Sequence, residues 1–368
     1  SNVGYRIYDY YEVGRNAIIG GAESTGVYAS DLGNKSITWE TTTEFNLGVD
    51  FGIFNNRFKL AAEYFKRKIT DLLVTNKPLP FYNEVNKIAG NIGSTQSQGV
   101  EITLNTVNIV TKDFEWDTTL TLSHYNDRWL KRDPNWKPRA YEKEDDPIRA
   151  WWEYEAIGIL QPGEKAPDAQ KDLVPGMMKL KDRDGNGVLG DEDKVYMGNG
   201  DPKIIYGLNN SFRYKNFDLN AFFVYAGGNK LRNSVLKMDD QLGTQTLKGI
   251  ANRWTADDSN AQVRMYLDIP AQVKTYASTF QDWWQYGDIN VKDAGYVKLR
   301  SLSVGYNLPF TVCQHLRLSS LKVKVQVNNL FTWCKAGSDI DPESYGMNDG
   351  TRGIASPKTY SIGLSTSF

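Results

Sequence analysis

Strict alternation of apolar and polar residues is the dominant pattern in this chain. Between Thr43 and Ile53 every second residue belongs to one set, and the residues between them are small, polar or acidic; the first set is Thr43, Phe45, Leu47, Val49, Phe51 and Ile53. The last twelve residues, Pro357 to Phe368, repeat the pattern with Tyr360, Ile362, Leu364, Thr366 and Phe368. Successive side chains of a strand point to opposite faces, so the pattern predicts strands with one apolar and one polar face.

The same alternation, bounded by turn residues, predicts about nine or ten long strands. They are expected at Tyr5 to Val13 (a possible strand, followed by a Gly- and Ser-rich loop), Thr42 to Ile53, Phe58 to Val74, Ser97 to Asn108, Phe114 to Arg128, Ile204 to Tyr214, Phe217 to Ala226, Tyr296 to Leu308, Leu318 to Phe331 and Pro357 to Phe368.

The connections between these strands alternate in length. Short turns at Asn55 to Arg57, Val110 to Asp113 and Lys215-Asn216 alternate with loops of roughly 20, 70 and 60 residues. This alternation predicts a sheet with short turns at one end and long loops at the other. Transmembrane barrels have this arrangement, with short periplasmic turns and longer extracellular loops. We therefore predict an all-β fold: an antiparallel up-and-down transmembrane β-barrel, present in part, with its C-terminus on the periplasmic side. A soluble meander or two-sheet sandwich is the alternative.

Composition narrows the class of protein. Hydrophobic residues make up 40% of the 368 residues and mean hydropathy is −0.51, and no window approaches the roughly 18 apolar residues of a spanning helix. Barrel strands need only about 9 to 11 residues, half of them facing a polar lumen, so the composition excludes a helical membrane protein and leaves a barrel open. The net charge of −1 shows no excess of basic residues of the kind that nucleic-acid-binding proteins carry.

Catalytic chemistry is poorly supported by the sequence. The two histidines, His124 and His315, lie far apart in the chain and share no metal-ligand spacing, and no nucleophile motif is present. We therefore expect no enzyme. Cys313 and Cys334 fall near opposite ends of one predicted strand, tens of Å apart at about 3.3 Å per residue, beyond the roughly 7 Å that a disulfide spans. Two free thiols are expected.

A calcium site is predicted in the roughly 70-residue loop, at DRDGNGVLGDED. Positions 1, 3, 5, 7 and 12 of a twelve-residue loop supply oxygens to a hard cation, and position 6 is a glycine that allows the turn. The expected ligands are Asp182, Asp184, Asn186, the carbonyl of Val188 and Asp193. Asp replaces the usual Glu at position 12, which shortens the reach, and we expect a structural ion rather than a sensor. The alternative is that Asp, Asn and Gly gather there only to make turns.

Aromatic residues in the long loops are candidates for contacts with a substrate or partner. The candidates are Trp151, Trp152 and Tyr154 in WWEYE, and Trp283 and Trp284 in WWQY. Exposed aromatic faces stack on sugar rings and fit apolar peptide side chains. The alternative is that each pair forms a small hydrophobic cluster that anchors a long loop.

Several stretches, taken in order, resemble one family. TWETTTEFNLGVDFGIFNNRF, QSQGVEITLN, the run from MMKLKDRDGNG to FVYAGGN, DAGYVKLRSLSVGYNLP, NNLFTW with DIDPESYG, and the terminal strand are similar to the C-terminal part of SusC-like TonB-dependent transporters of Bacteroidota. The resemblance runs from about Lys35 to Phe368. It implies an integral protein of the bacterial outer membrane whose barrel closes at about 22 strands.

The resemblance also implies a function and partners. It implies import of oligosaccharides or oligopeptides, a SusD-like surface lipoprotein over the extracellular mouth, an internal plug and a TonB box, with outer-membrane lipid around the barrel. The sequence holds neither plug nor TonB box, so residues 1–368 are expected to be the C-terminal part of the barrel, with further chain upstream. Either glycan or peptide fits as the substrate. A passive porin or a surface adhesin built on the same barrel is the alternative function.

Overall fold

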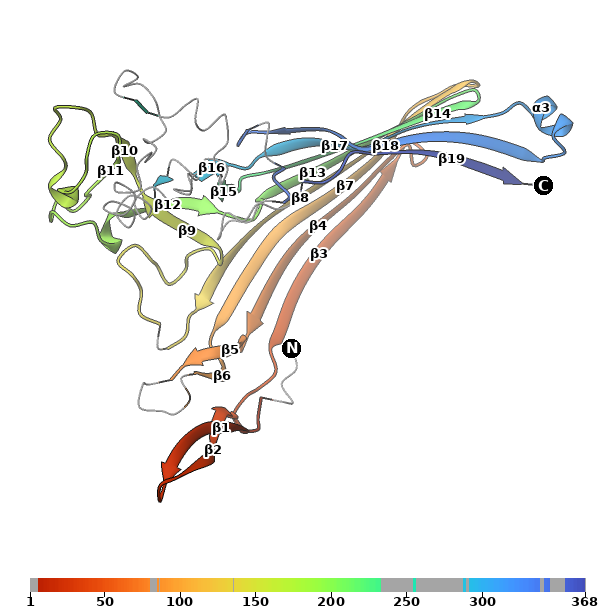
Figure 1. Ribbon diagram of the computed structural model, residues 1–368. Helices are drawn as coiled ribbons and strands as arrows, with labels where there is room; N and C mark the ends of the chain where they lie inside the picture. The colour runs from red at the N-terminus through yellow and green to blue at the C-terminus, as the bar shows by residue number, and fades with distance from the viewer. Residues whose placement is uncertain are drawn as a thin grey trace.

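The computed structural model describes residues 6–79, 85, 87–134, 136–232, 254–255, 287–288, 291–337, 341–344 and 355–367. Its main feature is one nine-stranded antiparallel sheet, called the wall below (Figure 1). The strands lie in the order β3 (Thr41–Ile53), β4 (Phe58–Thr70), β7 (Ser94–Val110), β8 (Phe114–Lys131), β13 (Ile204–Tyr214), β14 (Phe217–Gly227), β17 (Tyr296–Asn307), β18 (Ser320–Cys334) and β19 (Thr359–Ser367). Neighbours in the sheet are neighbours among the long strands of the chain, so the predicted up-and-down order is confirmed.

The connections sort onto two ends of the wall. The tight turns after β3, β7 and β13, and the short helix α3 (Phe310–His315) between β17 and β18, lie at the end where β19 finishes; the described parts of the long connections lie at the other end (Figure 1). Phe54, Asn55 and Asn56 have positive φ in the first turn, and Lys215 has φ 51° in the third. The two ends are called the short-turn end and the long-loop end below.

Register fixes which residues share a face of the wall. Leu47 pairs with Tyr64, Tyr64 with Val100 and Val100 with His124, while Phe51 pairs with Leu60. Paired residues of an antiparallel sheet project to the same side, so the odd residues of β3 extend into one continuous apolar face. Phe45, Leu47, Val49 and Phe51 are 55 to 61% exposed. The opposite, polar face carries ion pairs, among them Arg67 with Glu44.

Two of the expected strands differ most from the structure; the others agree to within about three residues at each end. The strand from Phe58 ends at Thr70 instead of Val74, because Asp71 adopts φ 56°, and the chain continues into a separate hairpin of β5 (Leu73–Pro78) and β6 (Lys87–Asn91). Tyr5 to Val13 with its loop is instead a hairpin of β1 (Tyr10–Ile19) and β2 (Ala22–Asp31), turned by Gly20 and Gly21 at φ 62° and 81°. Glycines that signal a loop in the sequence make a two-residue turn here.

Small folded units occupy the long-loop end. The 132–203 insertion contains β9 (Ala150–Tyr154) paired with β12 (Lys194–Asn199), β10 (Ala156–Ile159) paired with β11 (Met178–Leu180), and the 3-10 turns η1 (Asp168–Gln170) and η2 (Asp191–Asp193). A further short pair is β15 (Lys230–Arg232) with β16 (Val291–Asp293). None of the helices in the described part of the chain has the length and apolar character needed to cross a membrane.

Candidate functional site

The 132–203 insertion has its own hydrophobic core. Leu160, Leu173 and Met177 are buried together, with Ala166 and Val174 packed against them. Gln170 ties the unit by accepting a 2.7 Å hydrogen bond from the Leu180 backbone N–H. The insertion is therefore an ordered unit that can hold side chains in fixed positions at the long-loop end.

The predicted aromatic residues of β9 lie in this unit. Trp152 is half-buried between Tyr141 and Tyr196, at ring-centroid distances of 5.1 and 5.2 Å, and Trp151 is half-buried with its indole N–H donating to Glu153 at 3.3 Å. Tyr154 is only 7% exposed. Trp152, Tyr141 and Tyr196 form a packed aromatic cluster, called the platform below, and Lys194 links Tyr154 to it by lying over the Tyr141 and Tyr154 rings. The contact of Trp151, Trp152 and Tyr154 with a substrate or partner stays a prediction.

The second predicted pair, Trp283 and Trp284, lies outside the described residues. The described residues that follow it, Gly287 and Asp288, contact the platform: Gly287 forms a parallel bridge with Tyr154, and Asp288 accepts a 3.0 Å hydrogen bond from the Ala156 backbone N–H. Two segments more than a hundred residues apart therefore meet at β9.

The predicted metal residues divide into two groups. Asp182, Asp184 and Asp193 each place a carboxylate oxygen within 4.8 Å of the others. Asn186 instead donates its side-chain N–H to Asp184 at 2.8 Å and accepts from the Val188 N–H at 2.7 Å. The structure thus brings three acids together, while Asn186 and Val188 make the turn beside them.

Backbone N–H groups hold the acidic loop in shape. Asp182 accepts from Gly185 and Gly187 at 2.7 and 2.8 Å, and these glycines adopt φ 73° and 80°. The bond from Gly187 contributes most to lowering the pKa of the Asp182 carboxyl. Asp193 is fully buried and closes the loop by accepting from Arg183 at 2.6 Å and Gly190 at 2.8 Å.

The donor set of this cluster suits a hard divalent cation. The ligand atoms on offer are all oxygens, and across the described ranges no cationic side chain forms an ion pair with Asp182, Asp184 or Asp193. Three carboxylates this close repel one another unless a positive charge balances them. The residues therefore fit a calcium ion, which would supply that charge.

The acidic loop and the aromatic platform are one continuous unit. Asp193 ends η2, and the next residue, Lys194, begins β12, whose Tyr196 packs on Trp152. Lys194 pairs with Asp191 at 2.8 Å, and its ammonium group lies over the Tyr154 ring at 5.2 Å. The acidic loop and the platform are therefore adjacent in the chain and share the contacts of Lys194.

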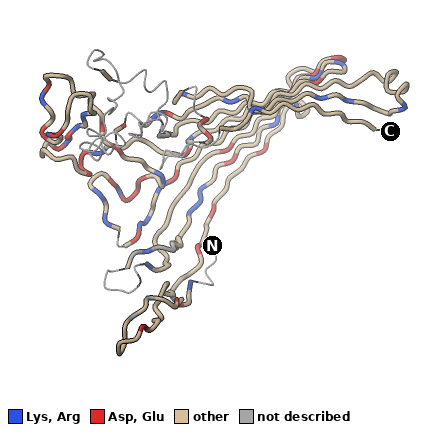
Figure 2. Tube along the Cα trace, in the orientation of Figure 1, with Lys and Arg blue, Asp and Glu red and all other residues tan. Residues whose placement is uncertain are grey.

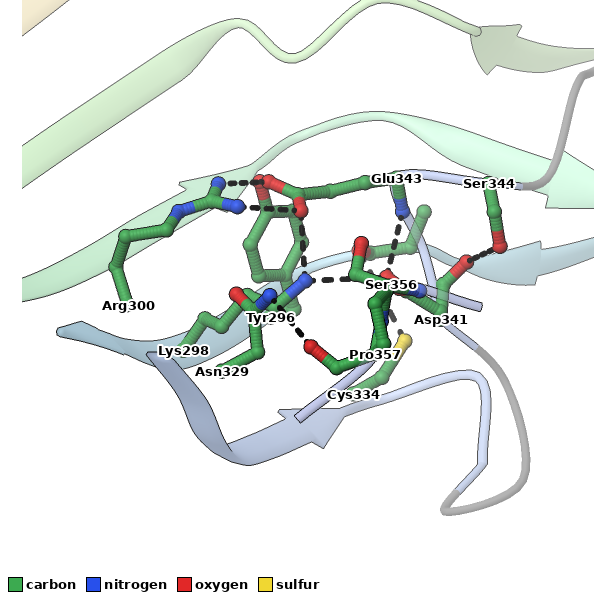
Figure 3. A network of polar contacts seen from close by, with 11 residues as sticks. Tyr296, Lys298, Arg300, Asn329, Cys334, Asp341, Glu343, Ser344, Ser356 and Pro357 are labelled. Atoms are coloured by element: carbon green, nitrogen blue, oxygen red, sulfur yellow. Dashed lines mark hydrogen bonds and ion pairs between the residues drawn. The ribbon is translucent and has the colours of Figure 1, made fainter. Parts of the chain in front are cut away.

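A buried polar network on the polar face of the wall was not found from the sequence. Lys298 of β17 is 1% exposed and bonds Glu343 at 2.7 Å and Asp341 at 3.5 Å (Figure 3). Arg300 also pairs with Glu343, which accepts a 2.9 Å hydrogen bond from the Tyr296 hydroxyl as well. The network anchors the connection between β18 and β19 to the polar face.

Electrostatics hold the two acids of this network ionised. Burial acts to raise the pKa of Glu343, but hydrogen bonds from Arg300, Lys298 and Tyr296 outweigh it and lower that pKa. Burial likewise opposes the lowered pKa of Asp341, which accepts a 2.7 Å bond from the Ser356 N–H. The signal in the sequence is a pair of cations, in KLR, within a strand of otherwise apolar and small residues; the acids of DPES that pair with them follow 43 to 45 residues later.

Both predicted thiols are free and buried. Cys313 lies in α3 at the short-turn end, and Cys334 ends β18 at the long-loop end beside Ala226 and Tyr296. The expectation of two unpaired cysteines is confirmed, because the full length of one strand separates them.

Fold and faces together define the class of protein: this sheet is part of the wall of a transmembrane β-barrel. The family described as "TonB dependent receptor-like, beta-barrel" matches residues 3–330, and the chain belongs to it. Its members are transporters of the outer membrane rather than enzymes, so the predicted family, fold and location are confirmed.

Several relatives are similar over most of the chain. TonB-dependent receptors P3 and P26 of Formosa agariphila are 28% and 26% identical over 96% of this chain, which covers 36% and 37% of their lengths. TonB-dependent receptor SusC of Bacteroides thetaiotaomicron is 29% identical over 50% of the chain, 19% of its own length. The chain thus spans little more than a third of the receptors that it matches along its length.

A solved structure shares the fold. The RagAB peptide importer in its open-open state superposes with a TM-score of 0.76 at 21% identity, over 99% of this chain and 38% of that one. At this identity the likeness shows the fold alone.

Proposed function

We propose that the protein to which this chain belongs imports oligosaccharides or oligopeptides across the outer membrane in a TonB-dependent reaction. Residues 1–368 form the C-terminal part of its barrel, and the plug and TonB box lie upstream. The observation that carries the proposal is a wall with one exposed apolar face and one charged face, crowned by ordered insertions. Such a wall separates lipid from a polar lumen, and the insertions offer binding surface at the mouth.

Uptake in cells tests this proposal against its alternatives. The full-length protein should take up labelled oligopeptide or oligosaccharide only when TonB is present and the inner membrane is energised. A passive porin would continue to transport after TonB deletion or protonophore treatment, and an adhesin would bind its target without uptake. Either of those outcomes would overturn TonB-dependent import.

A SusD-like lipoprotein is the proposed partner. The likeness to SusC and to RagAB, whose name denotes a peptide importer, supports it. Purification of the full-length protein from its own outer membrane should bring down a surface lipoprotein in a fixed ratio. Peptide is the substrate that the RagAB likeness favours, and competition between unlabelled peptides and glycans in the uptake assay separates the two.

Trp151, Trp152 and Tyr154, together with Trp283 and Trp284, are the proposed contacts for substrate or lipoprotein. The platform supports this role because it is ordered and lies at the long-loop end. Replacing Trp151 and Trp152 by Ala should weaken uptake and leave assembly in the membrane intact. Loss of folded protein from the membrane would instead mean that both residues serve only in packing. The matched control replaces the exposed Ile157 of β10 by Ala.

Calcium is the proposed ion at Asp182, Asp184 and Asp193, with Asn186 and the carbonyl of Val188 as further ligands. The support is the all-oxygen cluster without a cationic partner. Calorimetric titration of the full-length protein with Ca²⁺ should show one site that Asp182→Asn with Asp184→Asn removes. Asp168→Asn, an exposed acid of the same insertion, should leave binding unchanged. Equal Ca²⁺ binding by the Asp182/Asp184 double variant and by Asp168→Asn would contradict the calcium site and leave the loop with only a turn-forming role.

A further inference from the structure

The apolar face of the wall has a charged patch at one corner. The rows nearest the middle of the sheet are apolar on β3, β4 and β7: Leu47, Tyr64 and Val100 lie side by side, with His124 next on β8. One row farther toward the long-loop end, Lys66 lies between Phe45 and Gln98, and Asn126 follows. In the next row Lys68, Gln96 and Arg128 are adjacent. Lys66, Lys68 and Arg128 are called the basic patch.

Charge is sorted by face in this part of the wall. In β3, β4, β7 and β8 every acid with a registered partner lies on the polar face, on the same side as Glu44; the set is Glu44, Asp50, Glu63, Glu101, Glu115, Asp117 and Asp127. No Asp or Glu occupies an apolar-face position in any of the nine described strands. The tube in Figure 2 shows Lys, Arg, Asp and Glu along these strands. The basic patch therefore has no acid beside it on its own face.

The three cations are free to meet an anion. Lys66, Lys68 and Arg128 are all exposed, and none forms an ion pair with a carboxylate in the part of the chain that the structure describes. Neighbouring strands lie about 4.8 Å apart, so Lys68 and Arg128, with Gln96 between them, are separated by about 10 Å across the sheet. Long Lys and Arg side chains span that distance, and one phosphate group can be contacted from both sides.

The position of the patch selects its partner. It begins where the apolar band ends, at the long-loop end, which in a transmembrane barrel is the headgroup level of the outer leaflet. An unbalanced cation is costly in hydrocarbon, but at that level it meets the charged headgroups. Gln98 and Asn126 add amide N–H donors in the same rows, and amides with cations suit phosphate better than a neutral headgroup.

From this placement we propose that Lys66, Lys68 and Arg128 bind the phosphate of an anionic lipid headgroup in the outer leaflet. The site lies on the outside of the barrel and goes beyond the proposed import. The patch fixes one lipid against β4, β7 and β8, and with it the height at which this side of the barrel sits in the membrane.

Lipid binding by the full-length transporter tests the proposal. The purified protein in detergent is titrated with diphosphorylated lipid A, and bound lipid is counted by native mass spectrometry. Lys66→Gln, Lys68→Gln and Arg128→Gln together should weaken binding tenfold or more, since each surface cation contributes about fivefold toward an anionic headgroup. Lipid A stripped of its phosphates should bind wild-type protein as weakly as phosphorylated lipid A binds the triple variant.

A matched control removes the same charge from the polar face. Lys59→Gln, Lys322→Gln and Lys324→Gln together should leave the affinity for lipid A unchanged. Equal affinity of both triple variants, or equal affinity for phosphorylated and dephosphorylated lipid A, would overturn the proposal. So would a basic-patch variant that keeps its lipid but loses an acidic protein partner, because the patch would then be a protein-binding surface. The measurement of bound lipid A does not depend on uptake, so it still tests the lipid site if the proposed import fails.

Discussion

The wall and the 132–203 insertion are held together in different ways. In the wall, side chains on β3 and β19 remain exposed on both faces, and each strand is fixed by its backbone ladder to its neighbours. In the insertion, strands of three to six residues are too short to stand alone, and a hydrophobic core, buried acids and stacked rings hold them. The effect of a substitution in the wall therefore depends on whether its position faces lipid or the polar lumen. The effect of a substitution in the insertion depends on which packing contact or hydrogen bond is lost.

The largest effect is expected on the apolar face of the wall. Leu47→Arg places a charge among exposed apolar side chains and should destabilise the folded barrel by roughly 2 to 4 kcal/mol if the site lies near the bilayer midplane. Unfolding of the full-length protein in lipid vesicles measures it. Asn46→Arg, at the preceding residue and on the polar face, should reduce the stability of the folded barrel far less. Similar losses for both would contradict the assignment of the two faces.

The network that joins wall and loop should give the next largest effect. Glu343→Gln leaves Lys298 buried with only Asp341 nearby, and should cost about 2 to 3 kcal/mol after discounting for the partial exposure of Glu343. Hydrogen exchange should rise at residues 341–344 and at Tyr296, and the ladders of β3 and β4 should keep their protection. Unchanged exchange at 341–344 would mean that the network does not anchor the loop.

The same anchor should depend on pH. The pKa of Glu343 in the folded protein lies below its ordinary value of 4.5, so the ionised form is favoured by folding. The stabilisation is therefore fully present above about pH 4.5 and is lost as the pH falls through the lowered pKa. The protection of residues 341–344, expressed relative to intrinsic exchange, should fall in that range in the wild-type protein. It should fall less in Glu343→Gln, in which only Asp341 of the two acids still titrates.

In the insertion, loss of the buried acid should have a smaller and local effect. Asp193→Asn replaces an oxygen that accepts a backbone N–H and should cost about 1 to 2 kcal/mol. Faster exchange is expected in β9 and β12, with no change in β13 and β14. Equal changes in the wall would show that the insertion is not an independent unit.

The smallest effect is expected at the platform. Trp152→Leu keeps an apolar side chain but loses two ring contacts, at a cost of about 0.5 to 1.5 kcal/mol. The melting temperature of the full-length protein should barely change, while amide hydrogen exchange in β9 becomes faster. A large fall in melting temperature would place the platform in the main cooperative unit.

Much of the wall could be predicted from the sequence because its physics is local. Alternation along each strand decides which residues meet lipid, and Phe45 to Ile53 shows this without reference to any partner strand. The turn residues at Asn55 and Lys215 and the order of short and long connections then determine the topology. Three of the predicted metal ligands also came together, because Asp182 and Asp184 lie two residues apart and Asp193 closes the same loop.

Tertiary structure decided what depends on distant residues. Nothing local to Lys298 says that Glu343 will lie against it, since their contact requires a loop to fold back on the wall. Trp152 is a platform residue rather than an exposed one because Tyr141 and Tyr196 reach it from separate segments. The basic patch likewise exists only through register: Lys68 and Arg128 are sixty residues apart in the chain, and two ladders of backbone hydrogen bonds bring them onto one face.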